Sequence, residues 1–373
     1  MDSGTESPEY LSEQLITYIG NKRALLPFIG SALNLVRERL GGRPLDILDA
    51  FSGSGIVSRY FKSCARSLAV NDLERYAQVI SQCYLANPSA LDLPLLRETW
   101  SWLKTQLEEP LLRPGFLAEL YAPADDHAIK PGERAFYTRR NACYLDTART
   151  LMDTLSEDVR HFFLAPLLAE ASIHANTSGV FKGFHKNRLT GVGQFGGTGR
   201  DALSRITGPV ELHFPLFSRF ECPVTVYRSD ALELAREAGA GGIEFDLAYL
   251  DPPYNQHPYG SNYFMLNLLV DYNRPHTVSP VSGIPPDWQR SYWNRRSAVS
   301  SALSDLVDEL PARFVLVSFN SEGFLNLEDI TALLERRGRV TVLEQDYAVF
   351  RGSRNLSSRN TTVREYLFLL EKH

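Results

Sequence analysis

A buried strand that runs directly into a glycine turn constrains the fold of this chain most. Residues 45–51 are mainly apolar, the turn Ser-Gly-Ser-Gly occupies residues 52–55, and a helix-forming segment begins at Ile56. A second apolar strand follows at residues 67–72, and further strands are predicted at residues 224–227, 245–250 and 314–319. Strands that alternate with helices build mainly parallel sheets. We therefore predict an α/β fold whose sheet is covered by helices on both faces.

The middle of the 373-residue chain has a different pattern. Residues 86–223 show helical stripes and then, after Asn176, a glycine-rich basic stretch. We predict that residues 1–85 and 224–373 form one domain and that residues 86–223 are an insertion with its own task. Closing strands near residues 340–343 and 366–370 are predicted to form a hairpin across a long basic loop.

The glycine turn indicates a nucleotide-like cofactor at the carboxyl end of the sheet. Gly53 and Gly55 fit such a turn, but Ser58 replaces the third glycine of a dinucleotide fingerprint, which disfavours a nicotinamide cofactor. Asp49, just before the turn, would repel a pyrophosphate and suits a cationic amino group. Asp72, after the second strand, suits ribose hydroxyls, although a solvated strand end is an equal alternative. A ribose and an amino group without phosphate predict S-adenosylmethionine.

A second motif, Asp251-Pro252-Pro253-Tyr254, follows the predicted strand at residues 245–250. The two prolines stiffen the corner and remove two backbone donors, so the Asp251 carboxylate and the Pro252 carbonyl stand as paired acceptors. Paired acceptors match the two hydrogens of an adenine amino group and stabilise the positive charge that grows on its nitrogen during attack. Tyr254 would stack on a base that has been flipped out of the duplex.

Together these motifs resemble the Dam-like adenine-N6 DNA methyltransferases, which implies a Rossmann-like methyltransferase fold. The resemblance covers about residues 18–72 and 224–370. It includes the segment Tyr-Ile-Gly-Asn-Lys-Arg at residues 18–23, the glycine motif at 49–55, and Ser-Asp-Ala at 229–231. It implies that Tyr18 and Lys22 contact the methionine end of the cofactor. It adds Phe51 and Asp230 to the cofactor site, and it makes residues 86–223 the target recognition region.

The resemblance also implies double-stranded DNA as a partner, in a restriction-modification or related DNA-marking system with a possible cognate restriction endonuclease. A net charge of −5 gives no overall attraction to nucleic acid, so basic residues must gather on one face. One candidate stretch is Arg134, Arg139, Arg140 and Arg149. Two others supply the predicted DNA contacts, which are Lys182, Lys186, Arg188, Arg200, Arg354 and Arg359.

Other features narrow the class of protein. The four cysteines are far apart and have no histidine at a metal-ligand spacing, so we expect structural thiols and no metal. The polar N-terminus and the absence of a long apolar run predict a cytoplasmic protein without a membrane anchor. RNA adenine-N6 methylation and an inactive nucleic-acid-binding relative remain open, while Asp251 argues against cytosine or protein amides as targets. The interpretation requires the glycine turn and Asp251 to lie together, with the carboxylate not enclosed in a salt bridge.

Overall fold

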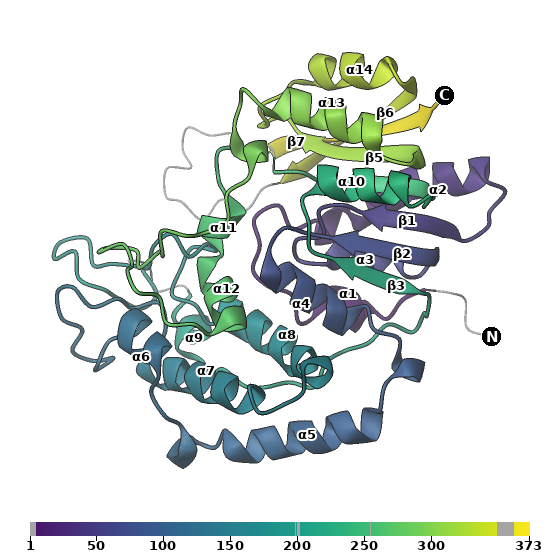
Figure 1. Ribbon diagram of the computed structural model, residues 1–373. Helices are drawn as coiled ribbons and strands as arrows, with labels where there is room; N and C mark the ends of the chain where they lie inside the picture. Colours follow the sequence, from purple (N-terminus) through teal and green to yellow (C-terminus); the bar gives the residue numbers. More distant parts are fainter. Residues whose placement is uncertain (1–4, 198, 200–201, 254, 349–361) are drawn as a thin grey trace.

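The computed structural model describes residues 5–197, 199, 202–253, 255–348 and 362–373 (Figure 1). Its strands form one seven-stranded sheet in the order β3-β2-β1-β4-β5-β7-β6. All neighbouring pairs are parallel except those made by β7, which runs antiparallel to both β5 and β6. The strands are β1 Leu45–Asp49, β2 Ala65–Asn71, β3 Val224–Tyr227, β4 Phe245–Leu250, β5 Ala312–Asn320, β6 Gly338–Ala348 and β7 Thr362–Lys372. The predicted mainly parallel, Rossmann-like sheet is confirmed.

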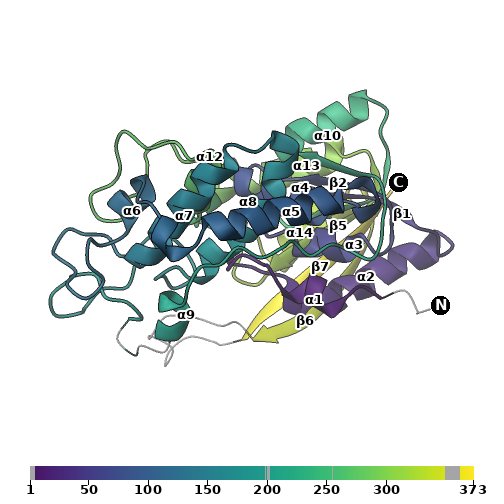
Figure 2. The same ribbon diagram turned by 90° about the horizontal axis from the view of Figure 1, so that it is seen from below.

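Helices connect the strands and build a second body beside the sheet. They are α1 Pro8–Ser12, α2 Leu26–Arg39, α3 Ile56–Phe61, α4 Arg75–Tyr84, α5 Leu93–Gln106, α6 Phe116–Tyr121, α7 Arg139–Met152, α8 Glu157–Ile173, α9 Leu203–Thr207, α10 Ala231–Ala240, α11 Tyr259–Asn262, α12 Phe264–Asp271, α13 Val299–Glu309 and α14 Leu327–Glu335. Seen from below, α5 lies in front of α8, on the outer side of the helical body (Figure 2).

The sheet is covered on both faces, as the apolar central strands predict. Ile47 in β1 belongs to a buried cluster with residues of α2 and α3, whereas its neighbour Leu48 belongs to a cluster with residues of α10, α13 and α14. Successive side chains of a strand point to opposite faces, so β1 contributes to both clusters. Because helices cover both faces of the sheet, loops can build a site at the ends of the strands.

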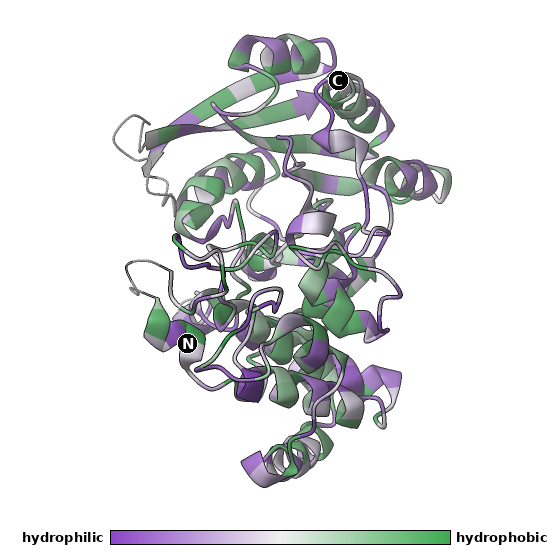
Figure 3. Ribbon diagram, turned by 90° about the vertical axis from the view of Figure 1, so that its left-hand side faces the viewer, coloured by the Kyte–Doolittle hydropathy of each residue, from purple (hydrophilic) through white to green (hydrophobic). Residues whose placement is uncertain are grey.

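The helical body has its own core. One buried cluster contains residues of α5, α6, α7 and α8 together with residues of α4 and α12, which lie outside residues 86–223. Figure 3 shows the sheet-containing part above the helical part, with loops between them. The predicted boundaries of the insertion remain a prediction, but the packed unit that the insertion belongs to also includes α4 and α12.

The boundaries of some strands match the sequence prediction, and those of others do not. β3 and β4 lie where they were predicted, because each is a short apolar run bounded by turn residues. β6 and β7 are longer than predicted and pair from Gly338 with Lys372 to Ala348 with Thr362, which confirms the hairpin. Their outer halves carry charged residues that a search for apolar runs does not detect.

Candidate active site

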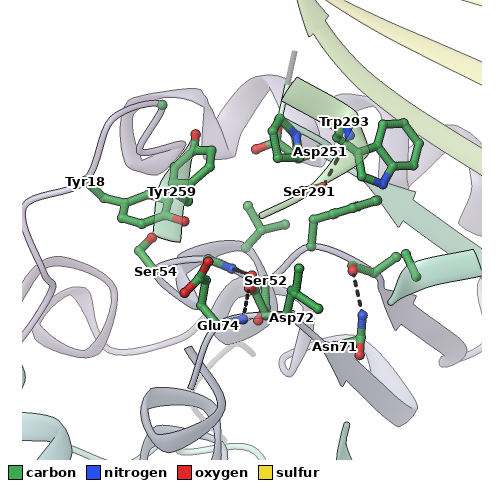
Figure 4. Close-up of a pocket in the computed structure, with 18 of the residues that line it drawn as sticks. Tyr18, Ser52, Ser54, Asn71, Asp72, Glu74, Asp251, Tyr259, Ser291 and Trp293 are labelled. Atoms are coloured by element: carbon green, nitrogen blue, oxygen red, sulfur yellow. Dashed lines mark hydrogen bonds between the residues drawn. The ribbon is translucent and has the colours of Figure 1, made fainter. Parts of the chain in front are cut away.

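A cavity opens at the carboxyl ends of β1, β2 and β4 (Figure 4). Counted together with its open mouth, the empty space between the wall residues is about 870 Å³. The predicted residues in its wall are Tyr18, Lys22, Phe51, Gly53, Asp72, Asp230, Asp251 and Pro253. In the sheet, Asp49 at the end of β1 pairs with Tyr249 of β4. Asp251 follows two residues later, so the glycine turn and Asp251 lie at neighbouring strand ends.

The glycine turn needs glycine for two separate reasons at Gly53. Its φ of +51° lies in the left-handed region, and a Cβ there would lie 2.9 Å from Tyr18 Cε1. The Gly53 amide donates a 2.8 Å hydrogen bond to Asp72 Oδ2, and the Glu74 amide donates one of 2.9 Å to Oδ1. Asp72 therefore holds the turn in position, in addition to lining the cavity.

Asp49 and Gly55 are not part of the cavity wall. Asp49 is completely buried, and its Oδ2 accepts a 2.5 Å hydrogen bond from Ser58 Oγ. Burial raises the pKa of Asp49 to about 7, while the Ser58 hydrogen bond opposes this rise. Gly55 has a φ of +77° and packs against Ile80. Both residues support the turn from behind, and their predicted contact with a cofactor stays a prediction.

Aromatic rings form two sides of the cavity. Tyr18 stacks on Tyr259 at 5.0 Å and on Tyr263 at 4.7 Å between ring centroids. On the other side, the edge of Phe51 meets Trp293 at 5.2 Å with an interplanar angle of 83°. Such rings give a flat ligand apolar surface without flexible side chains.

Asp230 both caps a helix and lines the cavity. It is the N-cap of α10, where Oδ1 accepts a 2.9 Å hydrogen bond from the Leu232 amide. The same oxygen accepts a 2.9 Å hydrogen bond from the Tyr292 hydroxyl, and the residue lines the cavity. Helix capping and a place in the cavity wall are thus compatible here.

Asp251 has a partner that the sequence did not predict. Lys22 Nζ lies 3.1 Å from Asp251 Oδ1, and the exposed fraction of the side chain is 3% for Lys22 and 18% for Asp251. Burial raises the pKa of Asp251, and Lys22 lowers it. The resemblance implied that Lys22 contacts the methionine end of a cofactor. Lys22 lines the cavity with its ammonium group against the Asp251 carboxylate, and the cofactor contact stays a prediction.

The sequence-based interpretation requires the glycine turn and Asp251 to lie together and the Asp251 carboxylate not to be enclosed in a salt bridge. The glycine turn and Asp251 line the same cavity. A salt bridge to Asp251 does exist, but it engages Oδ1, and the side chain keeps 18% of its surface exposed. Pro252 is buried behind it, while Pro253 is partly exposed in the cavity wall. The carboxylate is therefore ion-paired yet still accessible from the cavity. Tyr254 lies outside the described residues.

The predicted DNA contacts fall into two groups. Lys182, Lys186 and Arg188 are exposed in the loop after α8, and Lys186 Nζ lies 5.0 Å from the centroid of the Phe184 ring. An isolated bridge between Lys186 and Gly193 closes this loop. The other three predicted contacts lie outside the described residues, and they are Arg200, Arg354 and Arg359.

The basic stretch of Arg134, Arg139, Arg140 and Arg149 is used within the protein. Arg149 is buried and donates to the carbonyls of Leu269 and Val270. The other three also donate to backbone carbonyls. The prediction that Arg149 neutralises a phosphate is wrong, because its guanidinium group ties α7 to the end of α12.

Sequence reasoning missed several residues of the cavity wall, which are Glu74, Gln289, Ser291, Trp293 and Asn294. Glu74 directly precedes α4, a position where the helix dipole favours an acidic residue whether or not a ligand binds. The others come from the segment between α12 and α13, which has no recognisable motif. Only tertiary packing brings that segment to the strand ends.

Two further properties concern the part of the chain that the structure describes. There, no three His, Cys, Asp or Glu side chains gather as a metal site would require. None of the helices found there combines the length and apolar character needed to span a bilayer.

A mainly parallel sheet with a cavity where the strand order reverses, between β1 and β4, is the architecture of Rossmann-like methyltransferases. Comparison with known proteins gives the family. Residues 18–194 match the model of the D12 class N6 adenine-specific DNA methyltransferases. The chain is 30% identical over 362 residues to the type II methyltransferase M.CviAII of Paramecium bursaria Chlorella virus 1, with 95% of this chain and 98% of that protein covered. The chain belongs to this family of adenine-specific DNA methyltransferases.

Other relatives support the same assignment. The type II methyltransferase M.NlaIII of Neisseria lactamica is 27% identical over 366 residues, which cover 96% of this chain and 99% of that protein. The type II methyltransferase M.FokI of Planomicrobium okeanokoites is 25% identical over 368 residues, but these cover only 52% of that protein. The protein is therefore a site-specific DNA adenine methyltransferase, and methyltransferases of this family use S-adenosylmethionine in general.

Proposed function

We propose that the cavity at the ends of β1, β2 and β4 binds S-adenosylmethionine and that Asp251 and the Pro252 carbonyl hold the N6 amino group of a flipped-out adenine. The observation that carries this proposal is the shared cavity wall: the glycine turn and Asp251 stand at paired neighbouring strands. Methyl transfer needs the methyl donor and the acceptor nitrogen in line, which two adjacent strand ends can provide.

The residues of the cavity fit this cofactor. Gly53 leaves space between the turn and the Tyr18 ring that a Cβ would fill. Asp72 offers acceptors for ribose hydroxyls, and Asp230 offers one for the amino group of the cofactor's adenine ring. The edge-to-face pair of Phe51 and Trp293 supplies apolar surface beside them. Tyr18, Lys22, Asp49 and Gly55 complete the proposed cofactor set, the last two from behind the wall.

The protein's part in the reaction is to orient and to stabilise charge. The cofactor supplies its methyl group as part of a sulfonium, which is already a strong electrophile. The adenine amino nitrogen forms the new bond to the methyl carbon as the carbon–sulfur bond breaks, and one N–H proton leaves afterwards. Asp251 and the Pro252 carbonyl accept the two N–H hydrogens, so they stabilise the charge that develops on the nitrogen.

Lys22 makes sense within this mechanism because Asp251 must be ionised to accept a hydrogen bond strongly. Burial alone favours the protonated acid, and the ammonium group 3.1 Å away favours the carboxylate. Since Lys22 engages Oδ1 of Asp251, we assign the more exposed oxygen to the amino group of adenine. Tyr254 is proposed to stack on the flipped base.

The finer assignments of the partners follow from the relatives. We propose that residues 86–223 read a short sequence in double-stranded DNA, with Lys182, Lys186, Arg188, Arg200, Arg354 and Arg359 at phosphates. The named relatives are type II methyltransferases, so we propose a role in a restriction-modification system in the cytoplasm, with a cognate endonuclease as partner.

The test is methyl transfer by the wild-type protein and by Asp251→Ala. The wild type should transfer methyl groups to duplex DNA but not to RNA of the same sequence. Asp251→Ala should abolish transfer while S-adenosylhomocysteine still binds in a calorimetric titration. Full activity of Asp251→Ala would remove Asp251 from the mechanism, and sequencing the methylated adenines from expressing cells would give the recognition site.

A further inference from the structure

Glu74 is a buried acid in the cavity wall that the mechanism above does not use. Its exposed fraction is 5%, and it lines the cavity just before α4. Although it occupies the N-cap position of α4, its side chain makes no capping hydrogen bond. Within the described residues no lysine, arginine or histidine forms an ion pair with it. A buried carboxylate without a cation or a cap costs stability, which points to a function.

The contacts of Glu74 fix one oxygen and leave the other for the cavity. Asn267 Nδ2 donates a 2.6 Å hydrogen bond to Glu74 Oε2, and Asn267 Oδ1 accepts one from the Tyr76 amide. Across the described part of the chain, no hydrogen bond to Oε1 is found. Burial raises the pKa of Glu74 to about 7, and the Asn267 hydrogen bond opposes this rise. Asn267 thus acts as a clamp, from α12, that orients Glu74.

Asp72, the residue expected to bind ribose, is already occupied on both oxygens. One oxygen accepts from the Gly53 amide and the other from the Glu74 amide. Each of the two oxygens keeps a second lone pair and can accept one more hydrogen bond, but the two backbone amides set the position of Asp72. Figure 4 shows Asp72 and Glu74 next to each other in the cavity.

We propose that Glu74 is a second ribose-binding carboxylate, which accepts a hydrogen bond from one of the two adjacent ribose hydroxyls while Asp72 accepts from the other. This inference rests on the proposed binding of S-adenosylmethionine in the cavity. Two carboxylates separated by one residue match two donors on adjacent carbons, and they would repel a phosphate. The alternative donor is the amino group at the methionine end of the cofactor, and the experiment distinguishes it.

The first measurement is calorimetric titration of S-adenosylhomocysteine into wild type, Glu74→Gln and the control Glu98→Gln, an exposed acid on α5. A charge-assisted hydrogen bond predicts that Glu74→Gln binds about 10- to 100-fold more weakly, while Glu98→Gln matches wild type. Equal affinity of Glu74→Gln and wild type would overturn the proposal. If wild type itself does not bind, the proposed function fails, and the role of Glu74 fails with it.

The second measurement uses ligands that lack one group at a time. 5′-Methylthioadenosine keeps both ribose hydroxyls but has no methionine amino group, so the loss caused by Glu74→Gln should persist. The other two ligands are 2′-deoxy- and 3′-deoxy-S-adenosylhomocysteine. For the one that lacks the hydroxyl bound by Glu74, the variant and wild type should bind within about threefold of each other. For the other one, the loss should persist. A loss that disappears with 5′-methylthioadenosine would assign Glu74 to the amino group. A loss of the same size with both deoxy ligands would make it a structural residue, and either result overturns the proposal.

A third measurement uses wild type alone and does not depend on any substitution. Wild type should bind one of the two deoxy ligands about tenfold or more weakly than S-adenosylhomocysteine, because a buried acceptor is then left without its donor. Equal binding of all three ligands would also overturn the proposal. Thermal unfolding of Glu74→Gln verifies that the variant is folded, and Asn267→Ala, which removes the clamp, should weaken binding by a smaller factor.

Discussion

Replacing Lys22 by methionine removes the cation beside Asp251 and should move the pH dependence of catalysis. At 3.1 Å, two unit charges in an effective dielectric of about 20 interact by about 5 kcal/mol. That value is an upper limit, because 18% of the Asp251 side chain is exposed to solvent and Lys22 itself loses hydration when it is buried. We expect the Asp251 pKa to rise when Lys22 is replaced, because the cation that favours the carboxylate is lost.

The direction of the pH shift follows from the protonation state of Asp251 that is active. The mechanism needs ionised Asp251, so activity is present above its pKa and is lost as the pH falls through it. Lys22→Met raises this pKa, and the acidic limb of the rate profile therefore moves to higher pH. The assay is single-turnover methyl transfer to duplex DNA between pH 5.5 and 9, with cofactor and DNA saturating. Lys22→Arg, which keeps the charge, should retain the wild-type limb.

A second acid near Lys22 needs its own control. Burial raises the pKa of Glu365, and Lys22 lowers it, so Glu365 would also respond to the loss of the cation. The double variant Lys22→Met/Glu365→Gln should keep the shifted limb if Asp251 is responsible. A limb that returns to the wild-type position in the double variant, or one that never moves in Lys22→Met, would refute the assigned role of the pair.

Three further variants test the turn and the DNA contacts. Gly53→Ala should lower the affinity for S-adenosylhomocysteine about tenfold. The added Cβ would lie 2.9 Å from the Tyr18 ring, and a left-handed φ costs a residue with a Cβ about 1–2 kcal/mol. An unchanged affinity in calorimetric titration would mean that the turn adapts. Ser58→Ala should lower the free energy of unfolding by about 1.5–3 kcal/mol at pH 8. At pH 5.5, where Asp49 is protonated in the folded protein, the loss should be small. Equal losses at the two pH values, measured by urea unfolding, would contradict this. Arg188→Ser should reduce the slope of log DNA affinity against log salt by about 0.9, and an unchanged slope would remove Arg188 from the phosphate contacts.

The sequence predicted those features that are local. The run at residues 245–250 matches β4 because an apolar segment bounded by turn residues leaves little choice of structure. The cavity residues that follow strand ends, such as Gly53, Asp72 and Asp251, were predictable for the same reason, since the carboxyl ends of parallel strands meet at one edge.

Features created by tertiary packing were not predictable. Nothing near Lys22 in the sequence indicates that its ammonium group lies 3.1 Å from Asp251 Oδ1. Arg149 appeared as one of several surface arginines, yet it is buried and donates to two carbonyls at the end of α12. Trp293 comes from a segment without a motif, and it reaches the cavity only because β4, α12 and α13 bring that segment back to the strand ends.

One short segment links the two halves of the proposed site. Tyr18 lies over Gly53 of the glycine turn, and four residues later Lys22 pairs with Asp251. Tyr18 also stacks on Tyr259 and Tyr263, which follow that corner in the chain. The five residues from Tyr18 to Lys22 therefore contact both the glycine turn and Asp251.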